Sequence, residues 1–320
     1  MPILELNDAN LLLAASTIQT GGLVAFPTET VYGLGANALD AGAVAAIFSA
    51  KGRPATNPVI VHVRSVDAAA EVAEVNEIAT RLMDAFWPGP LTLVLPKRAN
   101  VPDVVTAGGS TVAVRQPNHP VAQRLLDIAG VPIAAPSANR SEAISPTRAE
   151  HVLASLGEKI LILDGGPSEV GLESTVLDVT VDPPRMLRPG MVTVAQIESA
   201  LDTKLASTLG ADVDIARSPG QMPRHYAPNT PLSIVDDVWA VANAARHQVA
   251  VIAWSAPRVD DYGDFMIWVL TDNPVVYAAS LYETLHEVDV AGVDEILVER
   301  VPDGQAWAAI RDRLTRAAAK

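Results

Sequence analysis

The sequence predicts an α/β protein built from two domains. Short apolar runs alternate with amphipathic helical patterns along the chain, and 320 residues exceed the usual size of a single domain. The third observation is the segment SPGQMPRHYAPNTP, in which prolines and a glycine interrupt the periodicity. With 49% hydrophobic residues, the chain has enough apolar side chains for two cores.

The first part of the chain predicts a mixed sheet surrounded by helices, because apolar runs follow one another with short links. Several of the helical patterns begin with a Ser, Thr or Asp cap. Strands are predicted at 23–26, 59–63, 91–96, 111–115, 132–135, 160–164, 174–181 and 185–189, and helices at 40–49, 65–86, 120–128, 147–156 and 193–201.

The second part predicts a small Rossmann-like domain, since strands and helices alternate after the proline-rich segment. We expect a catalytic domain at 1–205, a linker at 206–231 and the C-terminal domain at 232–320. Its strands are predicted at 232–235, 249–254, 265–270 and 295–299, and its helices at 238–246, 274–288 and 305–318.

Composition and charge exclude several classes of function. The formal net charge of −14 disfavours a protein that grips a nucleic-acid backbone over a wide face, so no stable nucleic-acid binding is expected. Without cysteine, thiolate metal sites and cysteine nucleophiles are excluded. No apolar run approaches the roughly 20 residues of a membrane span, and the N-terminus lacks a secretory signal, so we expect a cytoplasmic protein without membrane contact.

The stretch FPTETVYGLGANA places polar residues directly after an apolar strand. Thr28, Thr30 and Tyr32, with Gly33 and Gly35, would give donors, acceptors and close backbone access at a strand end, where ligands of α/β proteins usually bind. A turn whose threonines satisfy local backbone groups explains the same letters equally well. This stretch alone does not decide between them.

The letters GLGANA also fit a dinucleotide-binding fingerprint, which would predict a nicotinamide-dependent oxidoreductase. The context argues against it, because the glycines begin seven residues after the strand and no acidic residue follows about 20 residues later.

Three further segments combine cations and small polar groups. Lys51 and Arg53 follow a predicted helix, where they would also complement its dipole, and His62 lies in an otherwise aliphatic strand. In PSANRSEAISPT, Ser137 and Asn139 follow another strand, in a pattern suited to phosphate and ribose oxygens.

In this order, PTETVYGLGANA, KGRPATNP, VHV, AVRQP, APSAN, GLESTVLDV, LRPG and SPGQMPRHYAP resemble the long, two-domain form of the threonylcarbamoyl-AMP synthase family. The resemblance spans the chain and implies a YrdC-like catalytic domain, an open twisted sheet around a concave cavity, joined to a Rossmann-like domain. It implies a nucleotidyltransferase that condenses L-threonine, bicarbonate and ATP, with Mg²⁺ on the triphosphate, into threonylcarbamoyl-AMP and pyrophosphate. The product would serve a downstream tRNA threonylcarbamoyl transferase.

The same resemblance assigns residues. It implies catalytic roles for Lys51, Arg53, Ser137 and Asn139. L-Threonine would be bound by Thr30, His62, Arg115 and Ser174, and ATP by Arg53, Asn57, Thr111, Ser137, Ser145, Arg188 and Tyr226. No residue is expected to bind a metal. The linker residues Arg224, His225 and Tyr226 would form a lid that excludes water.

A nucleic-acid-binding module is the alternative, since a concave YrdC-like face could hold RNA. Its mark would be tight, salt-dependent tRNA binding without ATP turnover.

Overall fold

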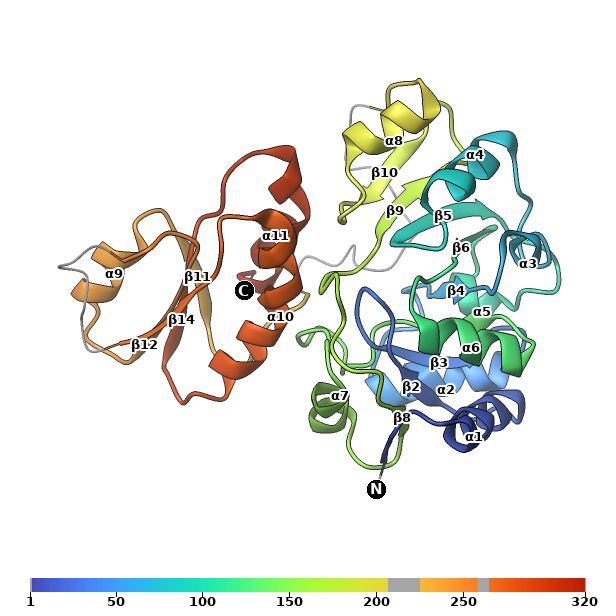
Figure 1. The fold of residues 1–320 in the computed structure, drawn as a ribbon, viewed down its shortest axis with the longest axis horizontal. Coiled ribbons are helices and arrows are strands. Elements are labelled where there is room, and N and C mark those ends of the chain that lie inside the picture. Colours follow the sequence, from blue (N-terminus) through green and yellow to red (C-terminus); the bar gives the residue numbers. More distant parts are fainter. Residues whose placement is uncertain (1, 207–224, 258–264, 320) are drawn as a thin grey trace.

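The computed structural model describes residues 2–206, 225–257 and 265–319. Most of the predicted linker, including Arg224, lies outside these residues. Figure 1 shows two sheets with their helices, one formed by the first two thirds of the chain and one by the last third. The predicted α/β class is confirmed, and so is the mixed character of the larger sheet.

The larger sheet has ten strands in the order β1-β8-β2-β3-β7-β4-β6-β5-β9-β10. Parallel and antiparallel pairs are mixed in it, since β4 runs parallel to β6 but antiparallel to β7. The strands are β1 (Ile3–Leu4), β2 (Val24–Phe26), β3 (Gly33–Asn37), β4 (Ile60–His62), β5 (Leu91–Pro96), β6 (Thr111–Arg115), β7 (Ile133–Ala134), β8 (Leu161–Leu163), β9 (Thr175–Asp178) and β10 (Arg185–Arg188).

Helices cover both faces of this sheet because successive strand side chains point to opposite sides. Val24 and Phe26 pack in one core with α1 and α6, whereas Ala25 packs in the other core with α2, α4 and α8. The helices are α1 (Asp8–Gln19), α2 (Ala41–Lys51), α3 (Val66–Ala69), α4 (Glu77–Phe86), α5 (Asp103–Thr106), α6 (Pro120–Ala129), α7 (Ala149–Leu156) and α8 (Val194–Leu201).

The single helix predicted at 65–86 is wrong, because two helices separated by residues 70–76 occupy this segment. Between them the backbone N–H of Glu74 donates to the Pro96 carbonyl, 2.9 Å away, and the Asn76 side chain caps the second helix. Pairing with the end of β5 therefore overrides the helical pattern.

Two other helices also differ from the prediction. The helix α1 was not predicted, and α2 extends through Lys51 instead of ending before it.

The glycine-rich GLGAN forms strand β3 rather than a nucleotide-binding turn. A Cβ at Gly35 would lie 2.7 Å from the Phe26 ring and 2.8 Å from the Ile133 side chain. Glycine at this position therefore lets two neighbouring strands carry large side chains, which accounts for the letters that resemble a dinucleotide fingerprint.

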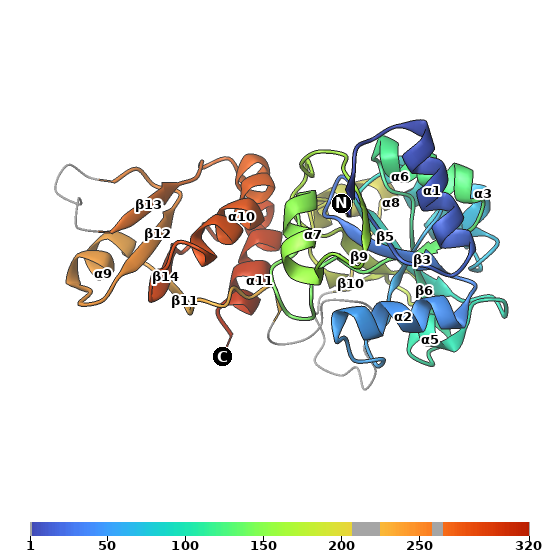
Figure 2. The ribbon, with the colours of Figure 1, turned by 90° about the horizontal axis from the view of Figure 1, so that it is seen from below.

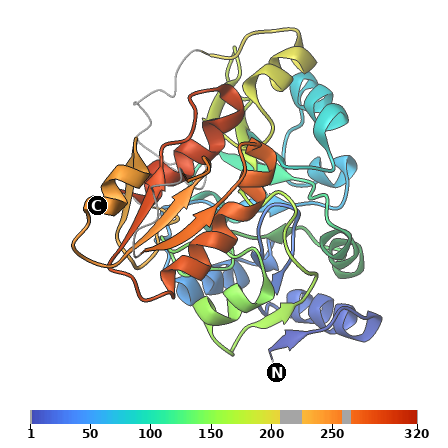
Figure 3. The same ribbon diagram turned by 60° about the vertical axis from the view of Figure 1, so that its left-hand side comes forward.

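The smaller sheet is parallel, with the order β11-β14-β12-β13. Helix α9 covers one face and helices α10 and α11 cover the other, as Figures 2 and 3 show. The elements are β11 (Leu232–Val235), α9 (Val238–Ala244), β12 (Val249–Ala253), β13 (Met266–Val269), α10 (Pro274–Asp289), β14 (Glu295–Glu299), η1 (Gln305–Trp307) and α11 (Ala308–Ala317).

Helices α10 and α11 face the larger domain (Figures 1 and 2) and pack against it. Val31, Ile144 and Leu172 of the larger domain share one apolar cluster with the buried side chains of α10 and α11. At Gly171 a Cβ would lie 2.5 Å from the Ala278 carbonyl oxygen, so helix α10 approaches the backbone closely there. The two domains thus share a buried interface.

Within the described parts of the chain, every helix is too short or too polar to cross a bilayer.

Candidate active site

The strand register brings the predicted threonine-binding residues together. Strands β4 and β6 are parallel neighbours, and His62 pairs with Arg115 at their carboxyl ends. The loop after β2 carries Thr30 to the same point, where the Arg115 Nη1 donates to the Thr30 Oγ1 over 2.9 Å. These three residues line one cavity.

Arg115 is held from several sides although it is almost fully buried. Its Nε donates to the Gly89 carbonyl at 3.1 Å, and its Nη2 lies 2.7 Å from a carboxylate oxygen of Glu29, which is also buried. Among the described residues, neither Glu29 oxygen has a hydrogen bond, so this pair is a charge contact without ideal hydrogen-bond geometry.

His62 is neutral in this environment. Burial, aided by the nearby Arg115 charge, lowers its pKa to about 3. Its ring meets Phe26 edge to face with centroids 6.1 Å apart, and among the described residues its Nδ1 has no hydrogen-bond partner. A neutral imidazole with an unpaired ring nitrogen is suited to hydrogen bonding with a polar ligand.

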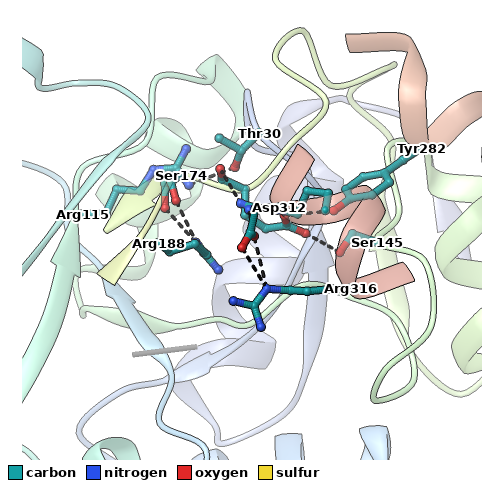
Figure 4. A network of polar contacts seen from close by, with 10 residues as sticks. Thr30, Arg115, Ser145, Ser174, Arg188, Tyr282, Asp312 and Arg316 are labelled. Atoms are coloured by element: carbon teal, nitrogen blue, oxygen red, sulfur yellow. Dashed lines mark hydrogen bonds and ion pairs between the residues drawn. The ribbon is translucent and has the colours of Figure 1, made fainter. Parts of the chain in front are cut away.

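Ser174 and Arg188 form the next part of the cavity wall. Ser174 precedes β9, and Arg188 ends the neighbouring antiparallel strand β10. The Arg188 guanidinium donates to the Ser174 carbonyl (3.0 Å) and hydroxyl (3.2 Å), and that hydroxyl also lies 2.7 Å from the Thr92 hydroxyl. In Figure 4, Arg115, Ser174 and Arg188 lie together on one side, and Ser145 and Tyr282 lie on the other.

Lys51 and Arg53 are both buried, but only Arg53 lines the cavity. The Lys51 Nζ donates to the carbonyls of Ser137 (2.6 Å) and Asn139. These hydrogen bonds connect the loop after β7 to helix α2. Burial and then the Arg53 charge hold the Lys51 pKa well below its usual value. Arg53 donates to the carbonyls of Asn57 and Pro58, and burial lowers its pKa to about 10.

The remaining predicted residues divide into two groups. Ser137 lines the cavity, while Asn139 donates to the Arg140 and Ala143 carbonyls and so shapes the loop around it. Asn57 and Ser145 are buried near the cavity without lining it. Thr111 lies at the opposite end of β6 from Arg115 and does not line the cavity.

The described end of the linker contributes to the cavity wall. His225 and Tyr226 are buried and line it, and Tyr226 has a left-handed backbone with φ of 62°. Burial lowers the His225 pKa to about 3 and raises the Tyr226 pKa. Among the described residues, the Tyr226 hydroxyl and the His225 Nδ1 have no hydrogen-bond partner, as expected of groups that contact a ligand.

Two buried carboxylates of this site were assigned no role from the sequence. Glu29 stands between two threonines and pairs with Arg115, and Glu173 lines the cavity beside Ser174. The signal available was their position close to the end or the start of a predicted strand, next to residues that were selected. The described residues contain no group of three or more His, Asp or Glu side chains that could hold a metal ion.

The comparisons with known proteins agree with this architecture. Residues 16–190 match the Sua5/YciO/YrdC family model, described as "Telomere recombination", and residues 192–319 match the model "Threonylcarbamoyl-AMP synthase, C-terminal domain". The chain is 42% identical to the threonylcarbamoyl-AMP synthase of Pyrococcus abyssi, over 98% of this chain and 95% of that protein. It is 40% identical to that of Bacillus subtilis, over 98% of this chain and 94% of that one.

Among solved structures, P. abyssi Sua5 complexed with L-threonine superposes with a TM-score of 0.90 and 42% identity, covering 99% of this chain and 97% of the other. Sequence and structure therefore match over nearly the whole length. The protein belongs to the threonylcarbamoyl-AMP synthase family.

Proposed function

We propose that this protein is an L-threonylcarbamoyladenylate synthase, a nucleotidyltransferase that converts L-threonine, bicarbonate and ATP into threonylcarbamoyl-AMP and pyrophosphate. The observation that carries the proposal is a single cavity lined by Arg53, Arg115 and Arg188 together with small hydroxyl groups, in a chain of this family. Three guanidinium groups around one cavity are suited to a ligand that carries a carboxylate and several phosphates.

Threonine would be bound around Arg115. Its guanidinium is buried and fixed by Thr30 and Gly89, so little side-chain entropy is lost when it meets the amino-acid carboxylate. The unpaired Nδ1 of His62 is available to the polar groups of threonine. The related P. abyssi structure was solved with L-threonine bound, which supports this assignment.

ATP would be bound by Arg53, Arg188, Ser137 and Tyr226. The guanidinium groups offset charge on the phosphates, and Mg²⁺ would enter with ATP, since Mg²⁺ is commonly held by substrate phosphates and water. Lys51 directs two of its three N–H donors at backbone carbonyls, so at most one is left for a phosphate oxygen. Its main contribution is to shape the loop that carries Ser137.

The chemistry requires positioning and charge neutralisation more than a protein nucleophile. The neutral threonine amine adds to CO₂ derived from bicarbonate and loses a proton, which gives a carbamate. A carbamate oxygen then attacks the α-phosphorus, and the bond to the β-phosphate oxygen breaks as pyrophosphate leaves. His225 and Tyr226 would exclude water, to which carbamate and mixed anhydride are both sensitive. A tRNA threonylcarbamoyl transferase would consume the product.

Pyrophosphate release tests the proposal directly. The purified protein is given ATP, Mg²⁺ and bicarbonate with L-threonine, with L-serine or without an amino acid, and the nucleotide product is identified by mass spectrometry. We expect release that threonine stimulates, a product with the mass of threonylcarbamoyl-AMP, and loss of both in Arg53→Gln. Folded, ATP-binding protein that shows no threonine-dependent release would refute the proposed function, and salt-sensitive tRNA binding by the same protein would favour the RNA-binding alternative.

A further inference from the structure

The C-terminal domain contacts the wall of the cavity at Glu173, a residue of the larger domain. The Arg313 Nε of helix α11 donates to its Oε2 over 2.8 Å, and the Tyr282 hydroxyl of helix α10 donates to the same oxygen over 3.1 Å. The Ser145 hydroxyl donates to the other oxygen over 2.5 Å. Figure 4 shows Ser145 and Tyr282 approaching this network from the side opposite Arg115.

Glu173 lies where a negative charge would oppose nucleotide binding. It lines the cavity beside Ser174, and the same cavity is lined by Arg53 and Arg188, which the proposed function assigns to the phosphates. An uncompensated carboxylate at this point would repel a triphosphate strongly, because charges interact over longer range in a buried site than in water. ATP binding therefore requires a positive charge that compensates the Glu173 carboxylate.

Arg313 is placed to offset this charge. Its side chain is fully buried, and no carboxylate but Glu173 and the adjoining Asp312 forms an ion pair with it among the described residues. Burial alone would raise the Glu173 pKa, but the charges of Arg313 and Arg188 and the Ser145 hydrogen bond outweigh burial and hold that pKa at about 2. The carboxylate is thus ionised and compensated from the C-terminal domain.

The same guanidinium supports the end of the linker. Its carbon lies 5.0 Å from the centroid of the Tyr226 ring, a cation–π contact, and the His225 backbone N–H donates to the Arg316 carbonyl of the same helix over 3.3 Å. Helix α11 therefore contacts Glu173 and also the linker residues His225 and Tyr226, all of which line the cavity.

We propose that Arg313 is a positioning residue through which the C-terminal domain neutralises Glu173 and so permits the cavity to accept the triphosphate of ATP. This inference rests on the proposed function for the identity of the ligand. It assigns the C-terminal domain a part in nucleotide binding, carried by one ion pair across the domain interface.

The test compares Arg313→Met, Glu173→Gln and the double variant in the full-length chain. Methionine keeps a stem against the Tyr226 ring while removing the charge. Arg311→Met is the matched control, because Arg311 lies on the same helix but donates to the Pro302 and Gly304 carbonyls of its own domain. ATP dissociation constants are measured by calorimetry without threonine, and the KM values for ATP and threonine are measured by pyrophosphate release.

We expect Arg313→Met to weaken ATP binding about tenfold or more, because it leaves a buried carboxylate unpaired at the site. The threonine KM should change much less. Glu173→Gln should bind ATP more tightly than the wild type, the double variant should return to within about threefold of it, and Arg311→Met should match it. A merely structural ion pair would also be rescued by removing the second charge, but it would not make Glu173→Gln bind ATP more tightly than the wild type.

Unchanged ATP affinity in folded Arg313→Met, or a double variant no better than Arg313→Met, would overturn the inference. Where Arg313→Met fails to fold, Glu173→Gln decides the matter, because unchanged or weaker ATP binding in that variant contradicts an offset repulsion. Wild-type protein that binds ATP but releases no pyrophosphate with threonine would refute the proposed function alone, since the calorimetric comparison needs no turnover.

Discussion

Replacing Arg115 by alanine should damage both stability and threonine binding, and the structure separates the two effects. In the folded protein the guanidinium lies 2.7 Å from Glu29, and both side chains are almost fully buried. Arg115→Ala leaves that carboxylate in the interior without its counter-charge. Removing one partner of a buried ion pair costs about 3–5 kcal/mol of the free energy of unfolding.

The second effect acts on the substrate. A hydrogen bond to a charged group contributes about 1.5–3 kcal/mol, so loss of the contact with the threonine carboxylate should raise the threonine KM roughly 10- to 150-fold. Because the same contact exists before and during the chemical step, kcat should change less than KM.

The double variant Glu29→Gln/Arg115→Ala isolates the binding term. With both charges removed, we expect urea unfolding to recover most of the stability lost in Arg115→Ala, while the threonine KM stays high. Initial rates of pyrophosphate release at saturating ATP supply the KM. A double variant with wild-type KM for threonine would refute the assignment of Arg115 to the substrate, and a fully stable Arg115→Ala would refute the reasoning about the buried pair.

Three further predictions concern Lys51, Gly171 and His151, a residue of helix α7 whose ring stacks on that of His286 in α10. Lys51→Met should abolish turnover and also lower the free energy of unfolding by about 2–4 kcal/mol, because one buried and one partly buried carbonyl lose their donor. Unchanged urea unfolding would show that the loop does not depend on Lys51. Burial lowers the pKa of His151 in the folded protein to about 3, whereas its value in the unfolded chain is about 6.5. Between these two pH values only the unfolded chain is protonated at His151. Stability should therefore fall as pH decreases through this range, by at most about 1.4 kcal/mol per pH unit for this half-buried residue. His151→Gln should flatten the pH dependence of urea unfolding between about pH 6 and pH 4, and an identical slope would contradict a neutral imidazole at this position. Gly171→Ala should push α10 away and cost about 1–3 kcal/mol, as seen in the melting temperature, whereas a neutral effect would mean that the interface yields easily.

The strands could be predicted from the sequence where their apolar runs were long. β5 and β6 consist mostly of apolar residues and appear as predicted. β3 was missed because GLGAN contains two glycines, which weaken a strand locally. Its strand conformation depends on Phe26 and Ile133, large side chains of neighbouring strands that occupy the space left free at Gly35. That requirement is tertiary and leaves no periodic pattern.

The sequence could predict that several polar residues would lie near one another at strand ends, but not which contacts they would make. His62 and Arg115 end strands, Thr30 follows β2 and Ser174 precedes β9. The arrangement of these strands brings all four residues to one cavity. The sequence could not indicate that Lys51 would turn away from the cavity toward two carbonyls, because this depends on where the loop after β7 lies relative to helix α2.

Arg313 was missed for a reason that suggests how similar residues can be found. It pairs with Glu173 across 140 positions of sequence, so no local motif contains both. Yet Ile310, Leu314 and Ala317 are buried on α11, and Arg313 lies on the same helix face at spacings of three and four. A cation within an apolar stripe must be paired or functional, because burying its charge alone is too costly. The interruption of that stripe therefore indicates a buried anion elsewhere in the protein, and in this chain the anion is Glu173, which lines the cavity of the candidate active site.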